Sequence, residues 1–245
     1  MTVVNTVQNM DWRELARRVR NEVGQVDALI VDAPYSARTH SGHDAISEKA
    51  SALGRREINY APWSGDDVRE FVETWSPLTR GWFVSLTDDV LSLQWRAAFE
   101  TAGRCGFAPL PFVQFGSRVR LSGDGPSSIT TQISVARPRS IEFARWGTMP
   151  GAYVQPPGEG YRPEVVGGKT LWIMESLVRD YTRPGDLVCD PCSGGGTTLV
   201  AAKLLGRRYI GGDLDEAHVE IARERLRDLP TKDKRGTLSL FGGDR

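Results

Sequence analysis

Apolar positions follow two different periods along this chain, one typical of buried strands and one typical of amphipathic helices. Apolar runs of strand length stand at residues 27–31, 82–86, 110–115, 129–136, 187–189 and 209–211. Apolar residues recur with helical spacing at 12–21, 66–75, 90–102, 170–181, 197–205 and 216–229. Strands that alternate with helices are typical of an α/β fold with a largely parallel sheet, and we expect that fold here.

Three stretches follow neither period. Residues 36–59 are polar, 117–128 are rich in glycine and serine, and 137–168 are rich in proline, glycine and arginine. Stretches this long inside a compact domain are usually functional or disordered. We therefore expect one domain over residues 1–230, with inserted loops at 36–59 and 137–168, and a flexible tail at 231–245.

Composition narrows the class of protein. Of the 245 residues, 40% are hydrophobic and 25% are charged, which excludes a fully disordered chain, a collagen and a disulfide scaffold. No apolar run approaches the roughly 20 residues that span a bilayer, and the N-terminus does not have the pattern of a secretory signal. Three cysteines fit a reducing compartment. We expect a cytoplasmic protein that does not contact a membrane.

Charge is balanced overall but uneven along the chain. The 31 basic residues equal the 31 acidic ones, which excludes a uniformly basic coat. From residue 66 to 100, seven acids stand against three arginines (net −4), and from 101 to 150, six arginines stand against two acids (net +4). A basic middle segment predicts a face for a polyanion. Its candidate contacts are Arg118, Arg120, Arg137, Arg139 and Arg145.

The strongest local pattern is a glycine-rich turn between two strands. A buried strand ends at Asp190, Gly194–Gly196 follow, Thr197 opens a helix, and the next strand ends at Asp213. Glycines let a ligand approach the backbone, and an acid about 20 residues later is placed for ribose hydroxyls. The spacing is neither a dinucleotide GxGxxG nor a Walker loop. A zwitterionic nucleoside such as S-adenosylmethionine fits it better.

This segment, DPCSGGGTT, resembles the D-P-[FC]-x-G-x-G-T cofactor motif of amino-methylating DNA methyltransferases. The following RRYIGGDLDEAHVEIARERL resembles the segment in which the family's acid binds the cofactor ribose. The resemblance implies S-adenosyl-L-methionine as the cofactor. The cofactor-binding residues it implies are Asp11, Lys169, Asp190, Pro191, Cys192, Ser193, Gly194, Gly196, Thr197 and Asp213.

A second motif, Asp32-Ala33-Pro34-Tyr35, resembles the catalytic D-P-P-Y of the same family. The exocyclic amine of adenine is a poor nucleophile, because its lone pair is conjugated into the ring. A carboxylate and a backbone carbonyl can hold both amine hydrogens and aim the lone pair at a methyl donor. Tyr35 would stack on a base flipped out of the duplex. Ala33 replaces the first proline but keeps its carbonyl, and aspartate at the first position implies adenine as the target.

The order of the motifs is also informative. The Asp32 motif comes first and the glycine loop last, which resembles the circularly permuted β class of these enzymes. The resemblance implies a Rossmann-like methyltransferase fold with a seven-stranded, mostly parallel sheet, in which the strands ending at Asp32 and Asp190 are neighbours. Residues 7–16 resemble the strand and helix that begin the family's domain, although Met10 stands where glycine is usual. Thr170 stands where proline is common.

These patterns predict a site-specific DNA methyltransferase that acts on the amino group of adenine. Three alternatives stay open: methylation of cytosine's amino group, action on RNA, and a cofactor- and DNA-binding module impaired by the change at Ala33. No metal is expected. Cys189 and Cys192 lack a second pair of ligands and predict buried packing, and His40 and His43 lie in a polar loop.

Double-stranded DNA is the expected partner, facing the two inserted loops. A sliding clamp is a second expected partner, because Leu238, Leu240 and Phe241 resemble the bacterial clamp-binding pentapeptide, with Thr237 in place of its glutamine. The alternative is that this segment packs on its own domain. A homodimer also stays open.

Overall fold

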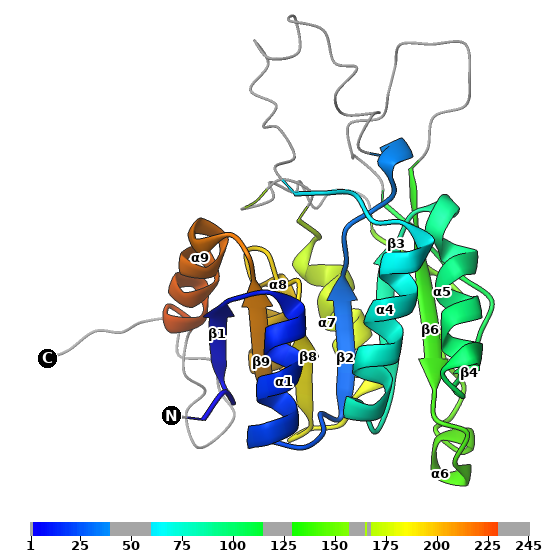
Figure 1. Ribbon diagram of the computed structural model, residues 1–245, viewed down its shortest axis with the longest axis horizontal. Helices are drawn as coiled ribbons and strands as arrows, with labels where there is room; N and C mark the ends of the chain where they lie inside the picture. Colours follow the sequence, from blue (N-terminus) through cyan, green and yellow to red (C-terminus); the bar gives the residue numbers. More distant parts are fainter. Residues whose placement is uncertain (1, 40–59, 115–128, 157–164, 166–167, 230–245) are drawn as a thin grey trace, which may run out of the picture.

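The computed structural model describes residues 2–39, 60–114, 129–156, 165 and 168–229. Within these residues a mixed sheet lies between two layers of helices (Figure 1). Its strands are β1 (Thr6–Asn9), β2 (Ala28–Asp32), β3 (Phe83–Thr87), β4 (Cys105–Gly106), β5 (Leu110–Val113), β6 (Thr130–Arg137), β7 (Tyr153–Val154), β8 (Leu187–Asp190) and β9 (Arg208–Asp213). The α/β fold class predicted from the sequence is confirmed.

One half of the sheet is parallel. Its strands follow the order β1-β9-β8-β2-β3, and β2 pairs with β8 through Leu29 and Cys189. The predicted neighbourhood of the Asp32 and Asp190 strands is therefore confirmed. All five strands end at the same edge of the sheet, which we call the site edge. Side chains that follow these strands come together there, as expected for open α/β sheets.

The other half of the sheet corrects the prediction of seven strands. The described residues form nine strands, of which β4 and β7 contain two residues each. Strands of two residues leave no apolar run in the sequence, so periodicity could not predict β4 and β7. β6 is antiparallel to both β3 and β5, so it begins at the site edge and ends at the opposite edge.

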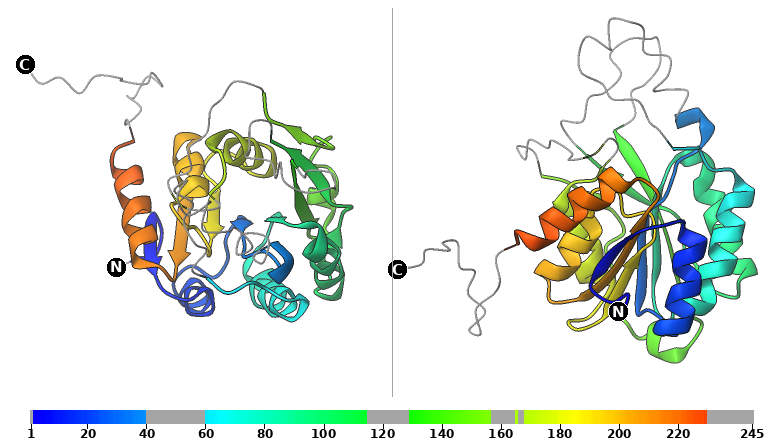
Figure 2. Two further views of the ribbon diagram at one scale, coloured as in Figure 1. Left: turned by 90° about the horizontal axis from the view of Figure 1, so that it is seen from above. Right: turned by 60° about the vertical axis from the view of Figure 1, so that its left-hand side comes forward.

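Helices cover both faces of the sheet (Figure 2). One face carries α1 (Trp12–Glu22), α4 (Gly65–Trp75) and α5 (Asp89–Thr101), and the other carries α7 (Leu171–Tyr181), α8 (Thr197–Leu204) and α9 (Glu216–Arg227). Alternate β2 residues point to opposite cores, with Leu29 in one and Ile30 in the other. Two short helices, η1 (Ser76–Leu78) and α6 (Ile141–Ala144), complete the described elements.

The ends of the helices follow the sequence. Asp11 caps α1 by accepting from the Arg13 N–H at 2.7 Å, and Asp215 caps α9 by accepting from the Ala217 N–H at 2.9 Å. Both caps satisfy backbone donors that the first turn leaves unpaired. None of the helices in the described part of the chain is long and apolar enough to cross a membrane.

Candidate active site

The glycine-rich turn joins β8 to α8 at the site edge. Gly196 has φ +76°, a left-handed conformation that favours glycine, and a Cβ there would lie 2.7 Å from the Cβ of Ala222 on α9. The turn is tied to β9, because the Ser193 N–H donates to Gly212 O at 2.8 Å. Glycine at 196 thus allows α8 and α9 to pack closely. The hydrogen bond from Ser193 holds the turn against the end of β9.

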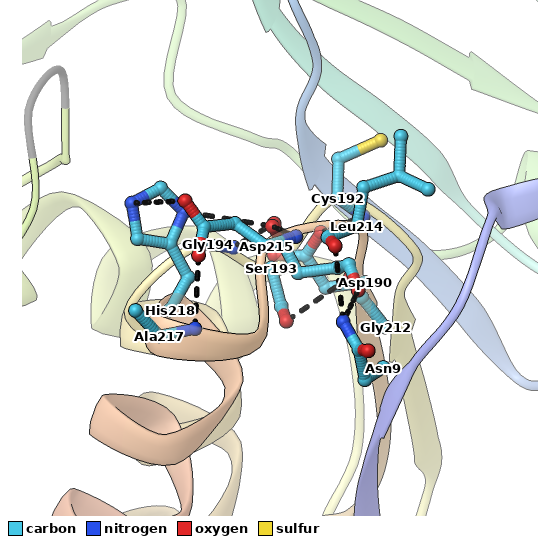
Figure 3. A network of polar contacts seen from close by, with 11 residues as sticks. Asn9, Asp190, Cys192, Ser193, Gly194, Gly212, Leu214, Asp215, Ala217 and His218 are labelled. Carbon is cyan, nitrogen blue, oxygen red and sulfur yellow. Dashed lines mark hydrogen bonds and ion pairs between the residues drawn. The ribbon is translucent and has the colours of Figure 1, made fainter. Parts of the chain in front are cut away.

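Asp213 ends β9 beside this turn. Its Oδ2 accepts from the Gly194 N–H at 2.8 Å, and its Oδ1 accepts from the Asp215 N–H at 3.0 Å. The imidazole of His218 approaches the same carboxylate, with Nδ1 3.5 Å from Oδ1. Figure 3 shows His218 and Asp215, from the start of α9, close to Gly194. The carboxylate is therefore fixed in direction and retains lone pairs for a ligand hydroxyl.

Asp190 is the buried acid of the site. It is 1% exposed, and its Oδ1 accepts from the Cys192 N–H at 3.1 Å. Burial raises the pKa of Asp190 to about 7, with smaller contributions in the same direction from the nearby Asp32 and Asp213, against hydrogen bonds from Thr198 and Cys192 that lower it. The group therefore changes charge near neutral pH.

Asp32 ends β2, the strand next to β8. Its Oδ2 accepts from the Lys169 ammonium at 2.8 Å, and its Oδ1 accepts from the Tyr35 hydroxyl at 3.2 Å. The same ammonium lies 4.8 Å from the centre of the Tyr35 ring. Burial, with the charge of Asp32, raises the pKa of Tyr35 well above its usual range, so its hydroxyl remains a donor. Lys169 comes from the segment before α7, far away in the sequence.

Two contacts hold the turn that follows Asp32. Ser36 donates from its N–H to Asp88 Oδ2 at 3.0 Å, while the other oxygen of Asp88 caps α5 at Leu91. The Trp63 N–H donates to Tyr35 O at 2.9 Å. The Trp63 ring packs against Trp12, Phe71 and Trp95. This tryptophan therefore anchors the turn in the core.

One pocket of about 650 Å³ opens at the site edge. The catalytic candidates that line it are Asp32 and Pro34, and the cofactor candidates that line it are Asp11, Lys169, Asp190, Pro191, Cys192, Ser193, Gly194, Thr197 and Asp213. Ala33, Tyr35 and Gly196 are not among its lining residues. The structure thus brings residues from both motifs, about 160 positions apart in the sequence, around a single cavity.

Three of the basic candidates of the middle segment, Arg137, Arg139 and Arg145, do not share this edge. Because β6 is antiparallel to β3, its last residue, Arg137, lies at the opposite edge of the sheet. Arg139 lines a second cavity there, together with Asp27 and Asp186, which precede β2 and β8. Arg145 follows α6 at the same end of the molecule (Figure 1). The sequence had grouped these three with the DNA-facing residues; Arg118 and Arg120 lie outside the described residues.

Several pocket residues were not singled out from the sequence. The most informative are Tyr60, Leu214 and His218, which all line the cavity. Leu214 is 69% exposed, which is unusual for a leucine beside a binding acid. His218 stands three residues after the cap Asp215, a spacing that places both on one face of α9. That spacing was the sequence signal that could have identified His218. No sequence pattern pointed to Tyr60.

Residues 169–224 match the family of DNA methylases that act on N6 or N4 amino groups. Curated relatives match over a short stretch. The Type II methyltransferase M2.DpnII of Streptococcus pneumoniae is 45% identical over 58 residues, 24% of this chain and 22% of its own length. M.HinfI of Haemophilus influenzae is 37% identical over 57 residues, 23% of this chain and 16% of its own length. The matched stretch thus covers about a fifth of the length of these relatives.

Solved structures match over most of the chain. The M1.HpyAVI–SAM complex has a TM-score of 0.66 and 20% identity, covering 90% of this chain and 98% of its own. PvuII DNA methyltransferase, described as cytosine-N4-specific, has a TM-score of 0.62 and 12% identity, covering 89% and 85%. The chain has the Rossmann-like methyltransferase fold. At these identities the likeness establishes the fold alone.

Proposed function

We propose that this protein is an S-adenosylmethionine-dependent DNA methyltransferase that modifies the exocyclic amino group of adenine. The observation that carries the proposal is the single pocket lined by Asp32 and by the glycine loop with Asp213. A hydrogen-bond acceptor for a target amine and a binding site for a nucleoside cofactor thus lie side by side. The match of residues 169–224 to DNA methylases supports the same activity.

The pocket fits the proposed cofactor at each of its parts. Asp213 is already oriented by the Gly194 N–H and can accept from ribose hydroxyls. The exposed Leu214 offers an apolar surface to the adenine ring. Asp190, buried behind the loop, can pair with the cationic amino group of the methionine part. When bound, the cofactor supplies an activated methyl group on a sulfonium.

The chain's own groups would prepare the acceptor. Asp32 accepts one hydrogen of the target amine, and the carbonyl of Ala33 accepts the other. This holds the nitrogen lone pair in the direction of the donor, an effect of orientation and of fixed dipoles. The packed turn from Asp32 to Ser36, anchored by Asp88, keeps both acceptors in place. The proton released by the amine after transfer can leave to solvent through the open side of the pocket.

The deciding experiment follows the methyl group into the nucleoside. The purified protein is incubated with deuterium-methyl cofactor and unmethylated double-stranded DNA, and the digested product is analysed by mass spectrometry. Labelled N6-methyladenine supports the proposal. Labelled N4-methylcytosine would make cytosine the target base and leave the proposed reaction class unchanged. Label in RNA alone, or in no nucleic acid over a panel of sequences, would contradict DNA methylation.

Cofactor affinity is expected to rise with pH between about 6 and 8. Burial raises the pKa of Asp190 to about 7, so the carboxylate is partly protonated in the free protein. A cationic ligand binds the ionised form better, so binding releases a proton. Affinity should then increase by up to about tenfold per pH unit below that pKa and level off above it. Calorimetric titration at several pH values measures the slope.

Asp190→Asn is expected to flatten this profile. His218 provides the matched control, because its hydrogen bond with Asp213 raises its pKa above the usual value for histidine. His218→Gln should keep most of the slope if Asp190 carries it. An unchanged slope in Asp190→Asn, or its loss in His218→Gln, would assign the linked proton to the histidine.

The expectations of a sliding-clamp partner and of DNA-facing loops rest on the sequence alone. The clamp-like segment Leu238–Phe241 and the loop at 40–59 lie outside the described residues. Double-stranded DNA is part of the proposal because residues 169–224 match DNA methylases. The clamp is a separate expectation, tested by comparing wild type with Phe241→Ala in a titration with a bacterial sliding clamp.

A further inference from the structure

The carboxylate of Asp32 is held from two sides by donors of its own chain. Lys169 donates to Oδ2 at 2.8 Å and the Tyr35 hydroxyl donates to Oδ1 at 3.2 Å. A carboxylate oxygen has two lone-pair directions, so each oxygen retains one for a further donor. The two contacts therefore fix the plane of the carboxylate without exhausting its capacity to accept a target amine.

Burial makes the contact with Lys169 strong. The side chains are 11% exposed for Lys169 and 19% for Asp32, so water screens the pair little. The ammonium also lies over the face of Tyr35, within the range of a cation–π contact. The three side chains form one packed unit, and removing the ammonium would leave a nearly buried carboxylate without its closest charged partner.

The backbone that carries Lys169 is itself fixed. The next residue, Thr170, caps α7 by accepting from the Ile173 N–H at 3.4 Å, and its hydroxyl donates to Gln155 at 3.2 Å. Thr170 and Gln155 are 3% and 1% exposed. This buried cap stands where the family resemblance leads one to expect proline, and it holds the start of α7 so that Lys169 reaches across the pocket to β2.

The geometry points to Lys169 as a positioning residue for the catalytic carboxylate, assisted by the Tyr35 hydroxyl. This inference rests on the proposed function, in which Asp32 receives the target amine. It differs from the sequence-based assignment of Lys169 to cofactor binding. A cofactor ligand would act on the affinity for S-adenosylmethionine, whereas a residue that aims Asp32 acts on the rate of transfer from the loaded complex.

The test separates rate from affinity. Lys169→Met keeps the length of the side chain without the charge, and it is expected to reduce the single-turnover rate by about 100-fold, the order of cost for a misplaced reacting group. The dissociation constant for S-adenosylmethionine should change by less than about threefold, a difference under 1 kcal/mol. Lys169→Arg should restore part of the rate, and Tyr35→Phe should reduce it by a smaller factor.

Lys203→Met is the matched control, because Lys203 is another partly buried lysine, bonded to Leu226 O at 2.6 Å, that does not line the pocket. It should leave the rate unchanged. An unchanged rate in Lys169→Met, or a tenfold weaker affinity for the cofactor at an unchanged rate, would overturn the inference in favour of cofactor binding.

A second measurement needs no substrate. Lys169→Met should lower the melting temperature in wild type but cause a smaller fall, or a rise, in an Asp32→Asn background, because partners in contact are not additive. Additive shifts would overturn the inference even in an active enzyme. A wild type that methylates nothing would contradict the proposed function alone, and this cycle would still report whether Lys169 holds Asp32.

Discussion

Asp32→Asn is expected to abolish nearly all methyl transfer while the protein still binds its cofactor. Asparagine keeps the size of the side chain but replaces a charged acceptor with an amide, whose NH2 cannot accept a hydrogen from the target amine. Loss of one polar group aimed at a reacting centre costs about 100- to 1,000-fold in rate. We expect a fall of that size at saturating DNA and cofactor, measured as labelled methyl per enzyme in a single turnover.

Cofactor affinity separates this effect from unfolding. Asp32 lies at the end of β2, whereas most of the groups assigned to the cofactor follow β8 and β9, so the dissociation constant should change by only a few-fold. Asp89→Asn is a suitable control, because Asp89 lies near the same edge in an exposed ion pair with Arg38, at 2.6 Å. Exposed pairs contribute little to stability. A rate in Asp32→Asn above a tenth of wild type would contradict the catalytic assignment.

The part of the site that could be predicted from sequence is the part encoded by local spacing. Asp190, the glycines and Asp213 are close in sequence and follow two adjacent parallel strands, so their meeting at one edge follows from the direction of the strands. The place of Asp32 beside them was expected from the resemblance of its motif to D-P-P-Y, and the pairing of β2 with β8 confirms that the two strands are neighbours. Periodicity placed the starts and ends of the six long helices to within two residues, and it did not predict the short helices η1 and α6.

The other features of the site depend on contacts between distant segments, which the local spacing of residues does not encode. Lys169 and Asp32 are 137 positions apart, and no pattern in either segment indicates that they pair. The direction of β6 decided the placement of Arg137, because a strand that runs antiparallel carries its last residues away from the site edge. A count of charged residues in a segment does not indicate at which edge of the sheet those residues will lie. The spacing of His218 from Asp215 indicated only a shared face of α9, and the packing of α9 beside β9 brings that face to Asp213.

Asp213→Ala is expected to weaken the binding of S-adenosylmethionine by about 10- to 100-fold. The carboxylate is oriented by the Gly194 and Asp215 N–H groups, so its remaining lone pairs are positioned for ribose hydroxyls before a ligand arrives. A hydrogen bond to a charged group contributes about 1.5–3 kcal/mol, which corresponds to that range of affinity. Calorimetry with the purified protein measures the change directly, and Asp228→Ala, an exposed acid at the other end of α9, should show none.

A ligand without one ribose hydroxyl makes this assignment specific. Wild type should bind 2′-deoxy-S-adenosylhomocysteine more weakly than S-adenosylhomocysteine, because a fixed acceptor then faces no donor. Asp213→Ala should no longer distinguish the two ligands, since the acceptor is gone. If the variant still prefers the ribose form by the wild-type factor, Asp213 does not bind that hydroxyl. In that case the weaker affinity would come from loosening of the glycine turn, whose Gly194 N–H loses its partner in the same variant.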